Sequence, residues 1–487
     1  MEMFKHQLDG VKFLLARRGA LLADEMGLGK TRQAVAAAYE LWRLDTVAQV
    51  LVLCPAGVAY AWEQELEKLT DGDTRLSFQR YRPGRKIKLD KVQRLNFLIV
   101  SYDTAWREPH LSLLARWCQD ASTLLVCDES SFLKSRTAKR TKRALKLRDL
   151  CERCWLLTGT PVTNSPLDLW SQLQVADSSI LRRFNNFYHF RARYARMGGF
   201  QFRQVIGYEN LDELRRLVAP HALRREKTGC LDLPPKLYTT REVALEPATW
   251  KIYKELREEA VAALSDAETQ LEPNAGVRLL RLAQLTSGIL GGQSQVAEQG
   301  DKIELGGRPE PPRDVSDEKL RWAVEHLTND ERPAAVIVWC RWRRERERLF
   351  IEFIGKERFI VYQIYGGQPK RLREEAIAAF SELHAGTYQR KILLAQPHAG
   401  GFGLNLTAAT EAIYLSHDFS LETRLQSEDR CHRIGQRSAV TYVDVLATGP
   451  AGQRTIDHVT VRALRQKQDL AAWTCAAWKR ALTEEAF

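Results

Sequence analysis

The chain has 487 residues, of which 44% are hydrophobic and 28% are charged, and its formal net charge is +12. This length allows two or three domains with buried cores. No apolar run approaches the roughly 20 residues that a transmembrane helix needs. The excess of Lys and Arg indicates a polyanionic partner such as nucleic acid, although many intracellular proteins are mildly basic. The nine cysteines follow no disulfide or zinc spacing, which predicts reduced thiols in a soluble cytosolic protein.

Short apolar runs alternate with helical segments in two parts of the chain, which is typical of parallel sheets covered by helices. The strands predicted in the first part are Gly19–Ala23, Val50–Cys54, Phe97–Ser101, Leu124–Cys127 and Trp155–Thr158. The strands predicted in the second part are Ala335–Cys340, Phe359–Ile364, Ile392–Ala395, Ala412–Ser416 and Thr441–Val445. The sequence therefore predicts an α/β fold with two parallel-sheet lobes and helical segments between them.

The stretch Ala23–Thr31 (Ala-Asp-Glu-Met-Gly-Leu-Gly-Lys-Thr) lies between the first predicted strand and a helix-permissive run. A glycine turn in that position is the arrangement of a phosphate-binding loop. Gly27 and Gly29 allow successive backbone N–H groups to face phosphate oxygens, and the helix N-terminus adds its positive dipole end. We expect Lys30 to contact the β- and γ-phosphates of ATP, and the hydroxyl of Thr31 to bind Mg²⁺.

Two carboxylates, Asp128 and Glu129, end the apolar run that starts at Leu124. In phosphate-loop ATPases an Asp at the end of a strand beside the loop holds Mg²⁺, and we expect Asp128 to do so. A following Glu can orient and deprotonate the attacking water, which is the role predicted for Glu129. The alternative is a pair of surface acids at a strand end. The turn Leu156–Pro161 is rich in hydroxyls that can sense the γ-phosphate, or it is an ordinary exit from a strand.

A glycine-dense loop and a pair of arginines mark the second lobe. The loop is Gln396–Leu406, and the arginines are Arg430 and Arg433 in the run Gln426–Gln436. Their spacing places both arginines one turn apart on one face of a predicted helix. Two guanidinium groups so placed can reach a triphosphate held by another lobe, as an arginine finger does. The alternative is a solvated basic helix.

Together these motifs resemble those of the Swi/Snf-type ATPases of the helicase superfamily. The loop is similar to that family's own phosphate loop, including Asp24 where the general pattern has a glycine. The resemblance implies that Gln7 reads adenine and that Gly403 and Gln426 contact the nucleotide. It extends from residue 4 to about residue 446, and further matching segments are Leu157–Asn164, Leu223–Lys227, Leu233–Lys236, Ala399–Thr407 and Asp429–Gln436.

The resemblance implies two RecA-like lobes that hold ATP and Mg²⁺ and that move along duplex DNA as a monomeric motor, with no membrane partner. The expected parts are an ATP-binding lobe (1–176), its helical protrusion (177–240), a second protrusion with the linker (241–315), a second lobe (316–450) and a helical brace (451–487). Because the chain begins close to Gln7, we expect a bare motor of the bacterial or phage-infected cytoplasm. Ser130 and Ser131 stand where the family has a small residue and then His, a departure that concerns the coupling of hydrolysis to DNA contact.

Arginines and aromatic residues are interleaved in residues 182–225, which hold ten Arg, no Lys, three acids and eight Phe or Tyr. This mixture suits phosphate contact and base stacking. We nevertheless expect the aromatic residues to form the small core of a protrusion, and some of the arginines to approach DNA. The basic run 134–148 predicts a solvated helix or the floor of a cleft. In the run 341–348 positive and negative side chains alternate, which predicts an exposed helix.

Only nineteen residues lead from Thr407 to Gln426, and a predicted strand with its following turn occupies most of them. This spacing leaves no room for the β-hairpin wedge that strand-separating helicases often carry there. The sequence therefore favours translocation along duplex DNA. Two alternatives stay open: a strand-separating DNA or RNA helicase with the same catalytic residues, and a nucleotide-gated DNA-binding scaffold with weak hydrolysis.

Overall fold

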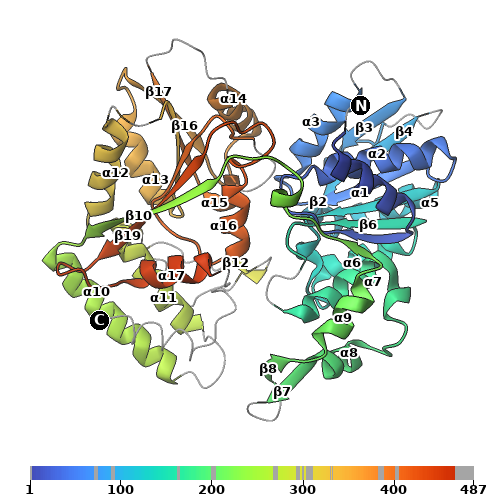
Figure 1. The fold of residues 1–487 in the computed structure, drawn as a ribbon, viewed down its shortest axis with the longest axis horizontal. Coiled ribbons are helices and arrows are strands. Elements are labelled where there is room, and N and C mark those ends of the chain that lie inside the picture. The colour runs from blue at the N-terminus through green and yellow to red at the C-terminus, as the bar shows by residue number, and fades with distance from the viewer. Residues whose placement is uncertain are drawn as a thin grey trace. The chain divides into compact units, whose positions relative to one another are not determined.

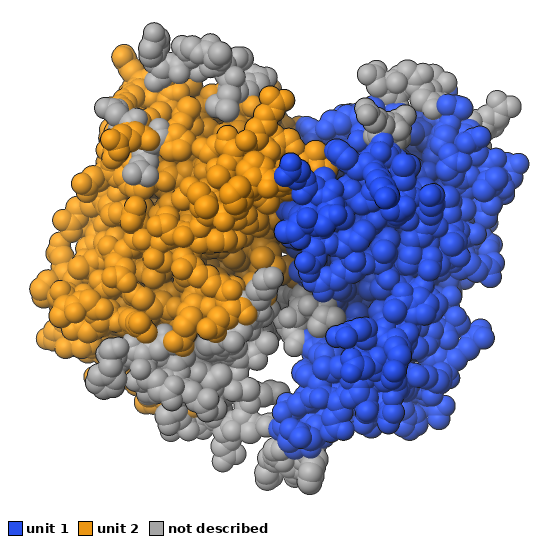
Figure 2. Space-filling model, in the orientation of Figure 1, with its two compact units in different colours: residues 1–232 blue, residues 233–487 orange. Residues whose placement is uncertain are grey.

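The chain, seen in a computed structural model, consists of two compact units, and the boundary falls between Asp232 and Leu233 (Figure 2). Each unit has its own sheet and its own core, and each is described by itself. The structure describes residues 3–70, 75–88, 94–161, 165–198, 204–266, 273–291, 297–298, 301–302, 311–329, 331, 333–381, 389–400 and 405–466.

Unit 1 is built on a seven-stranded sheet in the order β3-β4-β2-β5-β6-β1-β9 (Figure 1). All neighbouring strands are parallel. The strands are β1 (Gly19–Leu22), β2 (Gln49–Cys54), β3 (Leu76–Arg80), β4 (Leu95–Ser101), β5 (Thr123–Asp128), β6 (Arg153–Leu157) and β9 (Ala222–Leu223). Every residue of β1, β2 and β5 is buried, as in parallel sheets that are covered on both faces. That double burial explains why these strands read as continuous apolar runs.

Helices connect the strands of unit 1, as the alternating pattern predicted (Figure 1). They are α1 (Lys5–Leu15), α2 (Lys30–Arg43), α3 (Ala59–Thr70), α4 (Tyr102–Ala105), α5 (His110–Gln119), α6 (Lys139–Arg148), α7 (Leu169–Asp177), α8 (Phe187–Tyr194) and α9 (Leu211–Val218). The basic helix α6 buries Thr141, Ala144 and Leu147, and its lysines are exposed. The prediction of a solvated helix is confirmed for this segment.

A protrusion of unit 1 is formed by α8, α9 and the antiparallel hairpin of β7 (Ala195–Gly198) and β8 (Gln204–Tyr208). Its aromatic side chains pack on one another and on Trp170 of α7. The ring centroids of Trp170 and Phe190 are 5.2 Å apart, and those of Phe190 and Tyr194 are 4.8 Å apart. Phe190 and Tyr194 have no exposed surface. The prediction that the aromatic residues form a small core is confirmed for Phe184, Phe187, Phe190 and Tyr194, whereas Tyr188 and Tyr208 are exposed.

Unit 2 is built on a six-stranded parallel sheet in the order β10-β19-β18-β15-β17-β16. Its strands are β10 (Lys236–Ala244), β15 (Ala335–Trp339), β16 (Phe359–Ile364), β17 (Arg390–Ala395), β18 (Glu411–Tyr414) and β19 (Val440–Thr448). The first of these, β10, pairs with β19 over nine residues at one edge of the sheet. The sequence did not predict β10, because most of its residues are charged or polar and exposed, as at many sheet edges.

The helices of unit 2 are α10 (Pro247–Asp266), α11 (Pro273–Leu285), α12 (Glu318–Thr328), α13 (Arg343–Phe353), α14 (Lys370–Ser381), α15 (Pro397–Gly400), α16 (Leu421–Glu428) and α17 (Ile456–Arg465). Short strand pairs join β11 (Ile289–Leu290) to β14 (Arg313–Asp314) and β12 (Ala297–Glu298) to β13 (Asp301–Lys302). Within the described ranges, no helix has the length and apolar character needed to cross a membrane.

The prediction of an exposed helix at 341–348 is wrong for two of its charged residues. In α13, Glu345 and Arg346 are only 4% and 3% exposed. The carboxylate of Glu345 accepts a hydrogen bond from Ser416 Oγ at 2.5 Å. The guanidinium of Arg346 binds Gln363 and lies 4.0 Å from the ring centroid of Tyr365. These hydrogen-bond partners lie 71 and 17 residues away along the chain, so the local pattern of charges could not reveal the burial. All of the predicted strands are confirmed, and with them the α/β fold of two parallel-sheet lobes.

Candidate functional site

Three loops of unit 1 leave the carboxyl ends of adjacent parallel strands. The stretch Ala23–Thr31 follows β1, the pair Asp128 and Glu129 ends β5, and the turn Thr158–Pro161 follows β6. Because β6 pairs with both β1 and β5, the sheet brings the three loops to one edge. In open parallel sheets, ligands bind at this edge. The residues predicted to hold phosphate and metal in the first lobe are therefore gathered by the fold.

The phosphate loop bends at its two glycines. Gly27 and Gly29 have φ angles of 87° and 74°, in the left-handed region that glycine adopts without steric cost. Gly29 is the N-cap of α2, which starts at Lys30. A Cβ atom at Gly29 would lie 2.4 Å from Nε2 of Gln7, so the loop also requires glycine for space. The first turn of α2 thus presents backbone N–H groups at the loop, as in an anion-binding helix terminus.

Lys30 and Thr31 lie in the first turn of α2, and both are half-buried. The ammonium of Lys30 donates to the carbonyl oxygen of Asp24 at 2.8 Å. This bond folds the lysine back over the loop, so that its charge lies within the turn. The contact of Lys30 with a phosphate stays a prediction. The contact of Thr31 with a metal remains a prediction.

Gln7 lies on α1 and is only 2% exposed. Its Oε1 accepts from the backbone N–H of Phe4 at 3.2 Å, and its Nε2 donates to the carbonyl oxygen of Leu28 at 3.4 Å. The neighbouring His6 ring also contacts that carbonyl, at 3.2 Å. The N-terminal helix is therefore fastened to the phosphate loop through Gln7. That the same amide reads adenine stays a prediction.

Asp24 is fully buried at the start of the loop. Its carboxylate accepts from Arg225 Nε at 2.9 Å, from Arg225 Nη2 at 2.5 Å and from Gln33 at 3.2 Å. Arg225 also donates to Gln33 at 3.0 Å and to the carbonyl oxygen of His6. The acid that departs from the general loop pattern is thus the centre of a buried network. Sequence reasoning missed Arg225, whose one signal was the family landmark Leu223–Lys227.

The two carboxylates at the end of β5 differ in their surroundings. Asp128 accepts from the indole N–H of Trp62 at 2.7 Å and from the N–H of Glu129 at 2.9 Å. Burial raises the pKa of Asp128 above its usual value, and the bond from Trp62 and the charge of Lys30 limit that rise. Glu129 has a φ angle of 48°, a left-handed conformation that is uncommon for a residue other than glycine. Such strain is often found at functional sites.

Ser130 connects the acid pair to the turn that follows β6. Its hydroxyl donates to Oε1 of Gln172 on α7 at 2.8 Å, and Nε2 of Gln172 donates to the carbonyl oxygen of Pro161 at 2.6 Å. Within the turn, the N–H of Thr160 bonds to the hydroxyl of Thr158 at 3.1 Å. Ser130 and Gln172 have no exposed surface. Two buried side chains thus join the residue after the acid pair to the hydroxyl-rich turn.

In unit 2, the prediction that Arg430 and Arg433 share a helix is wrong. Helix α16 ends at Glu428, and both arginines lie in the consecutive turns that follow it. Beyond Glu428 the backbone tightens into i→i+3 bonds: the N–H of Arg430 bonds to the carbonyl of Ser427 at 3.3 Å, and that of Cys431 to the carbonyl of Glu428 at 3.2 Å. Gly435 then has a φ angle of 101°. We call residues 429–436 the arginine turn.

The arginine turn is bonded to the end of the glycine-dense loop. The carbonyl of Arg430 accepts from the N–H of Leu406 at 3.0 Å. The side-chain amide of Gln436 donates to the carbonyl oxygens of Thr407 and Cys431, at 3.1 Å in each case. These bonds hold together the two segments that the sequence assigned to the nucleotide. Gly403 lies outside the described residues.

Gln426, the other residue of unit 2 predicted to contact nucleotide, faces inward. It is 4% exposed, and its amide donates to Glu422 Oε1 at 3.1 Å on the same helix. In this structure the side chain stabilises α16. Its contact with a nucleotide stays a prediction.

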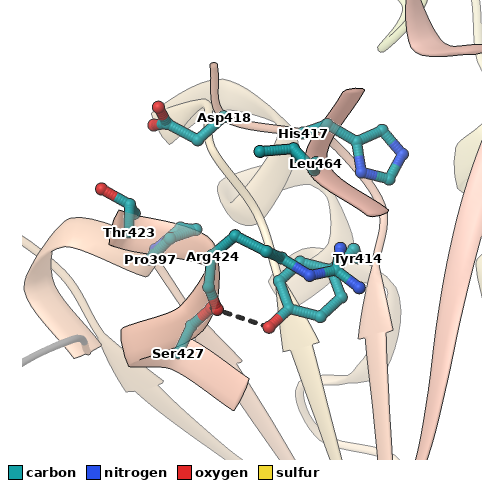
Figure 3. A pocket seen from close by; sticks show the side chains of 8 residues that line it. All are labelled: Pro397, Tyr414, His417, Asp418, Thr423, Arg424, Ser427 and Leu464. Atoms are coloured by element: carbon teal, nitrogen blue, oxygen red, sulfur yellow. Dashed lines mark hydrogen bonds between the residues drawn. The ribbon is translucent and has the colours of Figure 1, made fainter. Parts of the chain in front are cut away.

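A buried arginine fixes the helix that precedes the arginine turn. Figure 3 shows Arg424 lying over the ring of Tyr414, with the guanidinium 3.5 Å from the ring centroid. The hydroxyl of Tyr414 bonds to that of Ser427 at 2.7 Å (Figure 3). Arg424 also donates to Glu428 at 2.7 Å and to Asp444 of β19 at 2.6 Å. Helix α16 is thereby fixed to two strands of the sheet, and the position where the arginine turn begins is fixed with it.

Residues of β10 bind the start of the arginine turn. Lys236 Nζ lies 3.2 Å from Glu428 Oε2 and 3.1 Å from Asp429 Oδ1, and Tyr238 donates to Glu428 at 2.7 Å. Burial alone would lower the pKa of Lys236, but Asp429 and Glu428 outweigh it and raise that pKa. Sequence reasoning assigned no role to Lys236 or Tyr238. The signal for Lys236 was the family landmark Leu233–Lys236, and Tyr238 lies outside that landmark.

Comparison with known proteins identifies relatives that are named as helicases. The chain is 27% identical to an uncharacterized ATP-dependent helicase of Mycoplasma pneumoniae, over 96% of this chain and 42% of that protein. It is also 27% identical to the DNA annealing helicase and endonuclease ZRANB3 of Bos taurus, over 99% of this chain and 41% of that protein. The chain thus spans about two fifths of the length of these relatives. The Sulfolobus solfataricus SWI2/SNF2 ATPase core in complex with dsDNA is 22% identical, with a TM-score of 0.42, over 93% of this chain and 89% of that one.

Two family matches cover most of the chain. Residues 6–286 match the SNF2-related domain, and residues 318–435 match the helicase conserved C-terminal domain. The first match alone covers more than half of the sequence and includes the three loops of unit 1. The second includes the glycine-dense loop and most of the arginine turn. The resemblance drawn from the motifs is confirmed, and the chain belongs to the SNF2-related family of helicase-type ATPases.

Proposed function

We propose that this protein is an ATP-dependent, DNA-stimulated motor that moves along duplex DNA and remodels DNA or protein–DNA complexes. The observation that carries the proposal is the gathering of the phosphate loop, the acid pair and the hydroxyl-rich turn at one sheet edge of unit 1. Family membership supports the same reading, because the chain combines the SNF2-related and helicase C-terminal domains.

The residues of unit 1 have the chemistry needed to bind a nucleoside triphosphate with its metal ion. Lys30 and the N-terminus of α2 offer positive charge to the phosphates, and Thr31 and Asp128 offer the oxygen ligands that Mg²⁺ prefers. When bound, Mg²⁺ would neutralise charge on the β- and γ-phosphate oxygens. Glu129 orients the attacking water and accepts its proton as the oxygen of that water bonds to the γ-phosphorus and the bond to the β-phosphate oxygen breaks.

Arg430 and Arg433 of unit 2 supply the charge that unit 1 lacks for this reaction. In our proposal their guanidinium groups stabilise the negative charge that develops on the transferred phosphoryl group. A residue from a second lobe makes hydrolysis depend on the conformation of the whole protein. That dependence is the basis on which ATP turnover can drive movement.

Duplex DNA is the proposed track. The formal net charge of +12 favours a polyanion, and the basic helix α6 follows the acid pair in sequence. Only β18 and the start of α16 lie between Thr407 and Gln426, which leaves no hairpin wedge in that described segment. A strand-separating helicase remains the second candidate because it uses the same catalytic residues, and a weakly hydrolysing scaffold is the third.

The test is to measure ATP turnover by the whole chain with no nucleic acid, with single-stranded DNA, with duplex DNA and with RNA. We expect duplex DNA to raise kcat several-fold or more. No stimulation by any nucleic acid would overturn the motor. A triplex-displacement assay beside a forked-duplex unwinding assay then separates the first two candidates. We expect displacement of the third strand without unwinding of the fork.

A further inference from the structure

The segment that leads from unit 1 into unit 2 begins at the phosphate loop. Its first residues run beside the loop backbone: the N–H of Ala23 bonds to the carbonyl of Leu223 at 2.7 Å, and that of Glu25 to the carbonyl of Arg225 at 2.9 Å. The N–H of Lys227 bonds to the carboxylate of Glu25 at 2.8 Å. With the paired side chains of Asp24 and Arg225, the loop is bonded to this segment through both backbone and side chains.

The same segment ends at the arginine turn. The carbonyl of Pro234 lies 2.7 Å from Nε2 of His432, and Lys236 contacts the carboxylates of Glu428 and Asp429. Lys236 therefore contacts two acids where α16 ends and the arginine turn begins. The arginine turn contains the candidate arginine fingers. The side chains of Glu428 and Asp429 are 4% and 6% exposed.

The position of Lys236 has an electrostatic consequence. Without its ammonium group, Asp429 would lose a cation 3.1 Å from its carboxylate, while Glu428 would keep the guanidinium of Arg424. The two carboxylates are adjacent in a largely enclosed space, where like charges repel more strongly than in water. Because α16 ends at Glu428, we expect the loss of Lys236 to displace the start of the arginine turn.

Ten residues lie between the two anchors, Arg225 and Lys236, so eleven residue-to-residue steps join them. Part of this length is coiled: residues Lys227–Gly229 form a short 3₁₀ helix, and the N–H groups of Cys230 and Leu231 both bond to the carbonyl of Lys227. A segment of eleven residues spans at most roughly 40 Å when fully extended. The coil shortens the segment below this limit.

We propose that residues 225–236 form a strap that ties the phosphate loop to the arginine turn, with Arg225 and Lys236 as positioning residues at its two ends. Arg225 acts on Lys30 through Asp24 and the loop backbone. Lys236 acts on Arg430 and Arg433 through Glu428 and Asp429. This inference rests on the proposed function, since it gives the two arginines a role in hydrolysis.

The first experiment replaces the anchor in unit 2. In Lys236→Met we expect kcat for ATP to fall by about tenfold or more, while KM for ATP and the affinity for duplex DNA change less than twofold. Lys236→Arg should recover most of the rate. In an Arg433→Ala background, Lys236→Met should lower kcat no further, because both changes remove the contribution of Arg433 to hydrolysis. A full additional loss in that background would overturn the positioning role.

Two further variants separate positioning from folding. Lys319 is a buried lysine of unit 2, and its ammonium lies 2.7 Å from the carboxylate of Asp457. Asp457 does not belong to the arginine turn. Lys319→Met should lower the melting temperature and leave kcat of the folded protein unchanged. If Lys236→Met does not fold, Tyr238→Phe removes only the bond to Glu428. It should lower kcat two- to fivefold with KM unchanged, and a normal kcat in Tyr238→Phe would count against the role.

The second experiment lengthens the strap. Four residues, Gly-Ser-Gly-Ser, are inserted after Asp232, which leaves both anchors intact. We expect nucleotide affinity to be retained and the stimulation of ATP turnover by duplex DNA to be lost. The matched control has the same insertion after Ala451, in an exposed turn of unit 2. If the wild-type chain shows no response to DNA, the proposed function fails. If the wild type and the strap insertion respond equally, only the strap fails.

Discussion

Asp24 and Arg225 lie 201 residues apart in the sequence and form a buried ion pair beneath the phosphate loop. The side chain of Asp24 is inaccessible and that of Arg225 is 17% exposed. The carboxylate at this position therefore has a structural task that a glycine could not perform. It fixes the start of the loop, α1 and the segment after β9 to one another.

Removing Arg225 should destabilise unit 1 more than an ordinary surface change. In Arg225→Met the buried carboxylate of Asp24 keeps only its bond to Gln33. We expect a loss of about 3 kcal/mol in unfolding free energy, because breaking one side of a buried pair leaves an uncompensated charge. Chemical denaturation followed by tryptophan fluorescence measures it. The double change Asp24→Asn with Arg225→Met should recover part of the loss, and an unchanged stability of the single variant would contradict the assignment.

Replacing Arg433 by Ala should lower kcat for ATP by about 10³, which is the lower range for a true arginine finger. Steady-state hydrolysis in the presence of duplex DNA measures the effect. Arg437→Ala is the matched control, because Arg437 is an exposed arginine just beyond the arginine turn. A near-normal rate in Arg433→Ala would remove that residue from the catalytic set.

Trp62 should set the affinity of unit 1 for the metal. Burial raises the pKa of Asp128, and the bond from Trp62 lowers it. Trp62→Phe removes that donor, so the pKa of Asp128 should rise further. The acid limb of the pH–rate profile should then move to higher pH, and half-saturation by Mg²⁺ should need a higher concentration. Trp155→Phe, another buried tryptophan of the same unit, is the control and should leave the Mg²⁺ dependence unchanged.

Gln172 should affect the stimulation of ATP hydrolysis by DNA more than the basal rate of hydrolysis. Gln172→Leu breaks the path from Ser130 to Pro161 without touching the acid pair. We expect turnover without DNA to be retained within about threefold, and stimulation by duplex DNA to fall. Gln174→Leu changes a half-buried glutamine of the same helix and should behave like the wild type. Equal stimulation in both variants would show that Ser130 and Gln172 do not carry the signal.

Glu345 should make unit 2 less stable as the pH rises. Burial raises the pKa of Glu345 to about 7, from an ordinary value of 4.5. The folded chain therefore binds this proton more tightly than the unfolded chain, and unfolding free energy falls between about pH 4.5 and pH 7. The loss is of the order of 1–3 kcal/mol. Melting temperatures at pH 5 and pH 8 should differ less in Glu345→Gln than in the wild type. Glu347→Gln, on the partly exposed side of α13, should not change the pH dependence.

The buried strands of the two sheets and the motifs that follow them could be predicted from sequence because their signals are local, whereas β3, β9 and β10 were not predicted. Strands such as β2 and β5 are buried on both faces, so each reads as an apolar run that ends at a recognisable motif. The end of α16 could not be predicted, because the turn depends on bonds from Gln436 to residues 27 and 29 positions earlier. The anchors Arg225 and Lys236 were missed for the same reason. Their partners lie about two hundred residues away along the chain.

The aromatic core of the protrusion limits what this part of the chain can recognise. Phe190 and Tyr194 are enclosed around Trp170, so their rings cannot stack on nucleobases. The surface of the protrusion exposes Tyr188 and Tyr208, at 54% and 38%, beside its arginines. Guanidinium groups would contact phosphates, which are the same at every base pair, and base stacking would be left to these two rings. For the motor proposed above, binding through phosphates would allow passage over any DNA sequence.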